Sequence, residues 1–212
     1  MMLRKGDYMT SIFEQGFEHS EKLFEVSIDE FADKGYDKAS INTILKLAGM
    51  SKGQFYYHFK NKEALYFALI DNLIMKKQIF LGSHMNPEDF NKDIFTIFET
   101  QIRLGMRFGK EYPIIFKFSE CFIREKGKPI YKKAMAKYNF ENNDQIIQLI
   151  DRAYNRGEFR EELPREFIIK TVGFMFNKIP EMATVDDVTD YEEYLMHLID
   201  FMRKGLGRNS DK

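Results

Sequence analysis

The stretch from Ser40 to Lys62 decides the fold, and it reads SINTILKLAGMSKGQFYYHFKNK. Its first part carries the start and end signals of a short helix. Ser40 is a favourable N-cap residue, and apolar residues from Ile41 to Ala48 recur at helical spacing. Gly49 follows at a position where glycine commonly ends a helix. We therefore expect a helix over residues 41–48.

A second helix is expected to begin at Ser51. Gln54 follows three residues later, and serine and glutamine at this spacing form a capping box, in which each side chain binds the other residue's backbone N–H. The helix is short, because Asn61 soon offers the N-cap of a third helix. Two helices joined by a tight turn that contains glycine form a helix-turn-helix unit. We predict this unit over residues 40–59.

The second helix is expected to bury Phe55 and Phe59, which lie on one helical face. Its remaining side chains are mostly of the types that hydrogen-bond phosphates and base edges. The local charge agrees: residues 34–62 contain six lysines and one acidic residue, whereas residues 1–33 contain three basic and eight acidic residues. A basic face of this kind serves DNA binding even though the net charge of the chain is −1. The alternative is a solvated lysine face on an ordinary helical domain.

The segment from about residue 20 to residue 70 resembles the DNA-binding domain of the TetR family of bacterial repressors. The matching residues are Phe31, Gly35, Tyr36, Ser40, Ile44, Ala48, Gly49, Ser51, Lys52, Gly53, Tyr56, His58, Phe59, Lys62, Glu63 and Leu65. An ordered series of matches is specific, whereas a bare helix-turn-helix pattern is not. The chain departs from the family at Leu45, where alanine is usual, and at Phe55, where leucine or isoleucine is usual. Both changes enlarge a core position.

The resemblance implies that the chain binds double-stranded operator DNA through this unit. The expected DNA-binding residues are Ser40, Lys52, Gly53, Gln54, Tyr56, Tyr57, His58 and Lys62. The segment Lys52–Gln54 lies at the end of the helix that reaches base edges, and Tyr56 and His58 are expected at the DNA backbone or nearby bases. Lys62 opposes the dipole of its own helix, which a phosphate partner would explain. Half-buried packing is the alternative for Tyr56 and His58.

Composition bounds the remaining possibilities. The 212 residues suit one large or two small domains, and 44% hydrophobic with 31% charged residues is typical of globular proteins. The single cysteine, Cys121, excludes an intramolecular disulfide. The first residues lack the apolar segment of a signal peptide, and no stretch approaches the length of a membrane span. We expect a cytoplasmic protein that does not associate with membranes.

The rest of the chain has helical periodicity throughout. An opening helix starts at Ser11 or near Ser20 and ends at Gly35, and a long helix runs from Asn61 to about Phe80. The later segments are expected over residues 90–109, 113–127, 129–157, from 164 onward, and about 191–203. We predict an all-α protein with an N-terminal three-helix helix-turn-helix DNA-binding domain over residues 1–70. Residues 71–212 would form a larger C-terminal helical domain for ligand binding and dimerisation.

No spacing in the sequence points to catalysis or to a metal. His19, His84 and His197 lie far apart, and no HExxH, CxxC, GxSxG or phosphate-binding glycine loop occurs. We therefore predict no enzyme activity, no cofactor and no metal site.

The phenylalanine-rich middle of the chain has two interpretations. Most of these residues are expected to pack in a core, but the resemblance implies a cavity for an apolar effector. The candidate ligand-binding residues are Phe98, Arg103, Phe118, Cys121, Phe122, Phe174 and Asn177. The resemblance also implies a homodimer through the last two helices. Their stripes, Val172/Met175/Ile179 and Tyr194/Leu198/Met202, suit an intramolecular bundle equally well.

The sequence therefore predicts a sequence-specific DNA-binding transcriptional regulator, a homodimeric repressor that an unknown small apolar effector releases from its operator. Two alternatives stay open. The C-terminal domain could dock a protein partner without an effector, or the chain could be a helical ligand carrier or enzyme in which the lysine-rich motif is incidental. An exposed apolar groove without an enclosed cavity would favour the first alternative, and the lack of salt-dependent DNA binding would favour the second.

Overall fold

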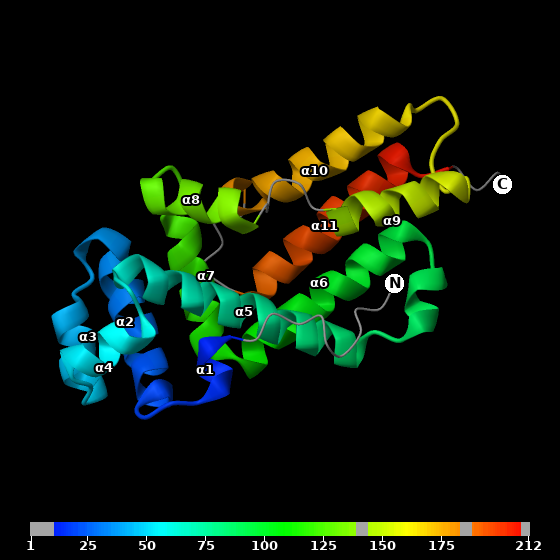
Figure 1. Cartoon of the computed structure of the whole chain (residues 1–212). Coiled ribbons are helices and arrows are strands. Elements are labelled where there is room, and N and C mark those ends of the chain that lie inside the picture. The colour runs from blue at the N-terminus through cyan, green and yellow to red at the C-terminus, as the bar shows by residue number, and fades with distance from the viewer. Residues whose placement is uncertain (1–10, 139–143, 183–187, 209–212) are drawn as a thin grey trace. The chain divides into compact units, whose positions relative to one another are not determined.

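The computed structural model describes residues 11–138, 144–182 and 188–208, and every regular element in them is helical (Figure 1). The α-helices are α1 (Ile12–Gln15), α2 (Ser20–Lys38), α3 (Ile41–Ala48), α4 (Lys52–His58), α5 (Lys62–His84), α6 (Ile94–Glu111), α7 (Pro113–Arg124), α8 (Pro129–Tyr138), α9 (Asp144–Asn155), α10 (Arg165–Met182) and α11 (Val188–Leu206). A 3-10 helix, η1, covers Pro87–Asn91. The predicted all-α fold is confirmed. Among the helices of the described ranges, none combines the length and the hydropathy that a membrane-spanning helix needs.

The helix-turn-helix forms as its capping residues predict. The Ser40 hydroxyl accepts a hydrogen bond from the Thr43 N–H at the start of α3, and Gly49 ends that helix with a φ of 69°. Ser51 and Gln54 form the complete capping box of α4. Asn61 accepts a hydrogen bond from the Ala64 N–H, at 2.8 Å, and so caps α5.

The opening of the chain uses both predicted helix starts. Ser11 caps the short α1, Gly16 takes a φ of 68°, and α2 then begins at Ser20. The regular helix that begins at Ser20 is interrupted at Gly35, where the sequence predicts its end, and a short helical piece continues beyond the kink to Lys38. Gly35 has φ 72° and ψ 168° at the kink, a conformation essentially reserved for glycine. Gly35 therefore separates two helical pieces within α2.

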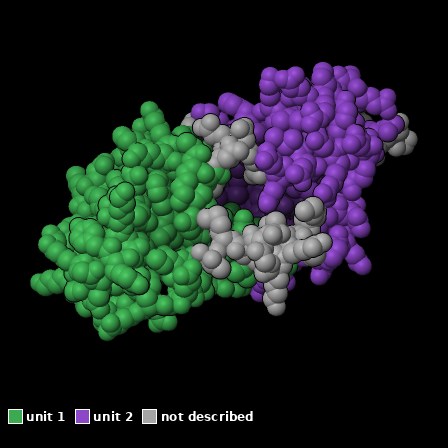
Figure 2. Space-filling view, in the orientation of Figure 1, with its two compact units in different colours: residues 1–82, 108–138 green, residues 83–107, 139–212 purple. Residues whose placement is uncertain are grey.

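The chain forms two compact units, coloured separately in Figure 2. Unit 1 contains residues 1–82 and 108–138, and unit 2 contains residues 83–107 and 139–212. Unit 1 extends beyond residue 70 and includes α7, which packs along α2. Phe118 of α7 contacts the buried Tyr66 of α5 edge to face, with ring centroids 5.3 Å apart. The helix-turn-helix therefore shares one core with residues of the second half of the chain.

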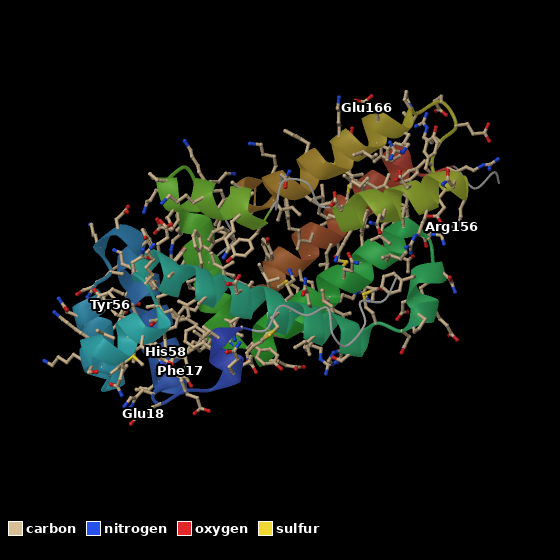
Figure 3. All side chains as sticks on the ribbon, viewed as in Figure 1. Phe17, Glu18, Tyr56, His58, Arg156 and Glu166 are labelled. Carbon is tan, nitrogen blue, oxygen red and sulfur yellow. The ribbon has the colours of Figure 1, made fainter. Side chains whose placement is uncertain are left out.

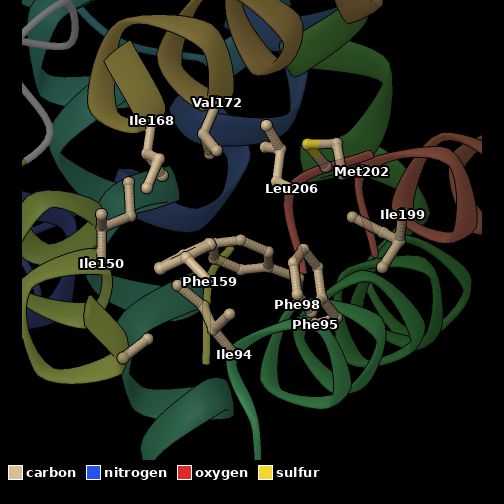
Figure 4. Packing of buried hydrophobic residues seen from close by; sticks show 11 residues of the cluster. Ile94, Phe95, Phe98, Ile150, Phe159, Ile168, Val172, Ile199, Met202 and Leu206 are labelled. Atoms are coloured by element: carbon tan, nitrogen blue, oxygen red, sulfur yellow. The ribbon is translucent and has the colours of Figure 1, made fainter. Parts of the chain in front are cut away.

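Unit 2 has a core of its own, drawn in Figure 4. Its buried residues come from α6, α9, α10 and α11 together with Phe159; they are Ile94, Phe95, Phe98, Ile150, Ala153, Phe159, Ile168, Val172, Ile199, Met202 and Leu206. Val172 is 0% exposed and Met202 is equally buried, so these members of the two predicted dimer stripes pack within the subunit. The segment predicted over residues 129–157 appears as α8 and α9, and residues 139–143 between them lie outside the described ranges.

Candidate nucleic-acid interface

Helix α4 divides its side chains between the core and solvent. Phe55 is fully buried, and it stacks on Phe59 with ring centroids 5.5 Å apart. Lys52 and Gly53 are exposed at the first turn. Tyr56 and Tyr57 are also exposed, and Tyr57 is 85% accessible. Such exposure of large aromatic side chains is unfavourable in water, so this face of α4 is a candidate binding surface.

Gln54 is held by two contacts inside the protein. Its carbonyl oxygen accepts the Ser51 N–H at 2.9 Å, and its amide nitrogen donates to the Glu18 carboxylate at 3.0 Å. Both ends of the carboxamide are thus engaged. The sequence suggested two roles for Gln54, capping and base contact, and the structure shows the capping role.

His58 lies against the turn that precedes α2. Its ring stacks on Phe17 with centroids 4.0 Å apart and an angle of 23° between the rings, and the two side chains are labelled together in Figure 3. Tyr57 contacts the same imidazole edge to face at 4.9 Å. His58 is half-buried, so the packing alternative describes much of its ring, whereas it does not describe Tyr56.

The ammonium of Lys62 has partners within the protein. It donates to the carbonyl oxygens of Tyr36, Asp37 and Ala39 at 2.7, 3.1 and 3.1 Å. It also lies 4.8 Å from the centroid of the Tyr36 ring. A lysine ammonium has three donors, so these contacts account for all of them. The position of Lys62 in a first helical turn therefore needs no phosphate to explain it, because the lysine holds the corner between α2 and α3.

The backbone N–H of Ser40 is held by Glu30, a residue that the sequence patterns did not connect with the helix-turn-helix. The buried carboxylate of Glu30 accepts the Ser40 N–H at 2.9 Å and pairs with Lys34 at 2.8 Å. Burial by itself raises the pKa of Glu30, but these contacts with Lys34 and Ser40 outweigh it and leave the pKa below its ordinary value. Glu30 therefore stays ionised and positions the start of α3.

Glu125 makes a second such contact from a distant part of unit 1. Its buried carboxylate accepts the Tyr36 N–H at 3.0 Å and pairs with Lys128 at 2.8 Å. Eighty-nine positions separate Glu125 from Tyr36, so no local pattern could have joined them. The corner before α3 is thus held from two sides. Lys62 donates to the backbone carbonyl groups of the corner, and Glu125 accepts the Tyr36 N–H.

The candidate ligand-binding residues are divided between the two units. In unit 1, Phe118 and Cys121 are buried, the Cys121 thiol donates to the Phe31 carbonyl, and Phe122 stacks on Tyr131. Burial raises the pKa of this thiol. In unit 2, Phe98 belongs to the core, whereas Arg103, Phe174 and Asn177 are exposed. The described structure does not gather these residues into one unit.

In the described part of the chain, no three His, Cys, Asp or Glu side chains gather in a way that could hold a metal ion. The candidate site consists of α4 and the residues that position it.

Residues 23–69 match the sequence model described as bacterial regulatory proteins, tetR family. The chain is 44% identical over 194 residues to the uncharacterized HTH-type transcriptional regulator YvdT of Bacillus subtilis, covering 88% of this chain and 94% of that protein. It is 25% identical over 167 residues to IcaR of Staphylococcus aureus, named as a negative regulator of a biofilm operon, covering 67% and 86%.

Solved structures share the fold. A TetR family transcriptional regulator from Chloroflexus aurantiacus has a TM-score of 0.68 at 21% identity, covering 94% of this chain and 99% of that one. The SmeT–triclosan complex has a TM-score of 0.71 at 17% identity, covering 90% and 92%. The helix-turn-helix with its exposed α4 and the YvdT likeness over nearly the whole length lead to one conclusion: this chain belongs to the TetR family of bacterial regulators, DNA-binding proteins that control transcription.

Proposed function

We propose that the protein is a homodimeric repressor that binds operator DNA through α4 and leaves it when a small apolar effector binds. The observation that carries the DNA-binding surface is the exposed outer face of α4, with Lys52, Tyr56 and Tyr57 in solvent above a buried Phe55. Repression is supported by the likeness to IcaR, which is named a negative regulator. The likeness to SmeT, solved with triclosan, supports a small-molecule effector.

We assign different roles to the α4 side chains. Lys52 and Gly53 lie at the N-terminal turn, the part of a recognition helix that reaches base edges. The hydroxyl groups of Tyr56 and Tyr57 and the half-buried His58 are suited to phosphate oxygens, which position the protein without selecting a sequence. Ser40, whose hydroxyl caps α3, has a second lone pair for a phosphate-bound water.

Dimerisation is proposed on the outer faces of α10 and α11, which lie side by side in Figure 1. Phe167 and Phe174 stand seven residues apart on α10, so they share a helical face, and Phe174 is 64% exposed. Phe201 on α11 is 62% exposed. Exposed aromatic side chains on two neighbouring helices are typical of a surface that a second subunit covers. Phe174, a candidate ligand-binding residue from the sequence, is therefore proposed as a subunit contact instead.

We propose that the two parts of the chain on either side of residue 70 have different functions. Residues 1–70 carry the DNA contacts, and residues 71–212 carry the effector and subunit contacts. An effector that lowers operator affinity tenfold needs about 1.4 kcal/mol of coupling between its site and the DNA site. Operator DNA must then weaken effector binding by the same factor.

One experiment tests the DNA-binding proposal directly. The full-length protein is used to select duplexes from a random pool, and the selected and scrambled duplexes are titrated at several salt concentrations. A repressor should prefer the selected duplex at every salt concentration, with affinity falling as salt rises. Equal affinity for both duplexes would contradict sequence-specific binding.

A further inference from the structure

The turn between α1 and α2 touches the recognition helix at two points. Glu18 hydrogen-bonds Gln54 at the first turn of α4, and Phe17 stacks on His58 at its last turn. Figure 3 labels Phe17 and Glu18 beside His58. The turn therefore runs along α4 and places a carboxylate at the end that approaches base edges.

The position of Glu18 is set by the backbone of the turn. Gly16 and His19, on either side of it, both have positive φ, 68° and 67°. Ser20 closes the turn, because its hydroxyl accepts the Phe17 N–H and its own N–H donates to the Phe17 carbonyl at 2.9 Å. His19 has a ring nitrogen 3.5 Å from the second carboxylate oxygen of Glu18.

Helix α1 anchors the turn from its other side. Glu14 pairs with Lys76 of α5 at 3.1 Å and accepts a hydrogen bond from Asn72. Phe13 packs against Phe24 and Phe59, with ring centroids 5.2 and 5.8 Å away. Glu18 thus projects from a segment tied to α2, α4 and α5.

The contact has a chemical consequence for base recognition. A glutamine identifies adenine by using its carbonyl oxygen and amide nitrogen together, on the N6 and N7 positions of the base. In this protein the carbonyl oxygen of Gln54 faces the Ser51 N–H and the amide nitrogen faces Glu18. These two contacts each take one of the two hydrogen-bonding sites at that end of the carboxamide and fix its orientation. A bidentate contact with adenine in any other orientation requires the carboxamide to leave both partners. The Glu18 charge additionally repels nearby phosphates.

We propose that Glu18 is a specificity-determining residue: it withdraws Gln54 from base recognition and lowers affinity for DNA of every sequence through its charge. This inference rests on the proposed DNA-binding function of α4. Sequence choice is then left to Lys52 and to the exposed surface around Gly53.

Three variants separate the charge of Glu18 from its hydrogen bond. Glu18→Gln keeps an acceptor for Gln54 but removes the charge. Glu18→Ala removes both and frees the amide nitrogen of Gln54, whose carbonyl oxygen is then held by the Ser51 N–H alone. The double variant Glu18→Ala/Gln54→Ala removes the carboxamide itself. Glu21→Gln is the matched control, since Glu21 is an exposed acid in the first turn of α2, whereas the carboxylate that accepts from the Gln54 amide is that of Glu18. Each full-length variant is first checked by thermal unfolding and then used for selection from a random duplex pool.

Glu18→Gln should strengthen binding to selected and scrambled duplexes alike, by roughly two- to fivefold at low salt, and this gain should shrink as salt screens the charge. Its selected sequence should match that of the parent protein. Glu18→Ala should add a preference for adenine at one position of each half-site, and the double variant should lose it. Glu21→Gln should select the parent sequence.

Identical selections by the parent protein and Glu18→Ala would overturn the role of Glu18 and leave the proposed function standing. Failure of the parent protein to select any sequence would remove the proposed function, and the inference with it.

Discussion

Substitution of Gly35 by alanine tests how the helix-turn-helix is held in place. Two separate costs are expected. Gly35 has φ 72° and ψ 168°, and an alanine in that region costs about 1–3 kcal/mol. Its Cβ would also lie 2.8 Å from a carboxylate oxygen of Glu125. This oxygen accepts the Tyr36 N–H, so moving it breaks a hydrogen bond to a charged group, worth about 1.5–3 kcal/mol.

The sum is about 2.5–6 kcal/mol, a large share of the 5–15 kcal/mol that stabilises a typical domain. Gly127→Ala is the matched control, because Gly127 also has positive φ, 87°, but nothing lies within 4 Å of its would-be Cβ. The free energy of unfolding is measured by urea denaturation at one fixed protein concentration. Gly35→Ala should cost more than Gly127→Ala, by roughly the value of the lost hydrogen bond.

A double-mutant cycle identifies the steric part. Glu125→Ala removes the carboxylate that a Cβ at position 35 would meet, so Gly35→Ala should cost less in that background, with a coupling of about 1–3 kcal/mol. Equal costs of Gly35→Ala and Gly127→Ala, together with no coupling to Glu125, would refute the argument that this carboxylate sits too close to position 35 to be displaced freely.

Lys52→Ala should cost about 1–3 kcal/mol of operator affinity without changing thermal stability, whereas Lys62→Ala should lower stability because three carbonyl groups lose their donor; equal stability of both variants would contradict this. Glu30→Gln should lower the free energy of unfolding at pH 7 by about 1–3 kcal/mol. The folded-state pKa of Glu30 lies below the ordinary value of 4.5. The stabilisation that the Glu30 carboxylate gives to the folded state is therefore present above the ordinary value and is lost as the pH falls through the folded-state pKa. The denaturation curves of the parent protein and the variant should then converge in acid. Phe174→Glu with Phe201→Glu should give a folded monomer by analytical ultracentrifugation, and a stable dimer would place the subunit contact elsewhere.

Local signals in the sequence were sufficient for the helix-turn-helix. The N-caps at Ser40 and Asn61, the capping box of Ser51 and Gln54, and the glycine at position 49 all act over a few residues, and the structure contains each of them. The burial of Phe55 followed from the helical period in the same way.

Contacts between distant segments were beyond such reasoning. The position of Lys62 against its own helix dipole predicts a phosphate partner, whereas the carbonyl groups that its ammonium contacts lie 23 to 26 residues earlier in the chain, where no local pattern points to them. The place of Gln54 near the start of its helix predicts a base contact, and no local pattern joins it to Glu18, 36 residues away. The stripe on α10 was correct in its period, but period alone does not say whether Val172 faces its own core or a second subunit.

The packing of α7 on α2 restricts how this DNA-binding part can be moved between proteins. Cys121 donates to the Phe31 carbonyl, Arg124 to that of Ala32, and Glu125 receives the Tyr36 N–H. A fragment that stops near residue 70 would expose Phe31 and Tyr66 to water and leave these backbone groups without their partners. A chimaeric regulator with new operator specificity would therefore need residues 108–138 transplanted together with the helix-turn-helix. The DNA-binding part is thus encoded by two separate stretches of the gene that must be exchanged together.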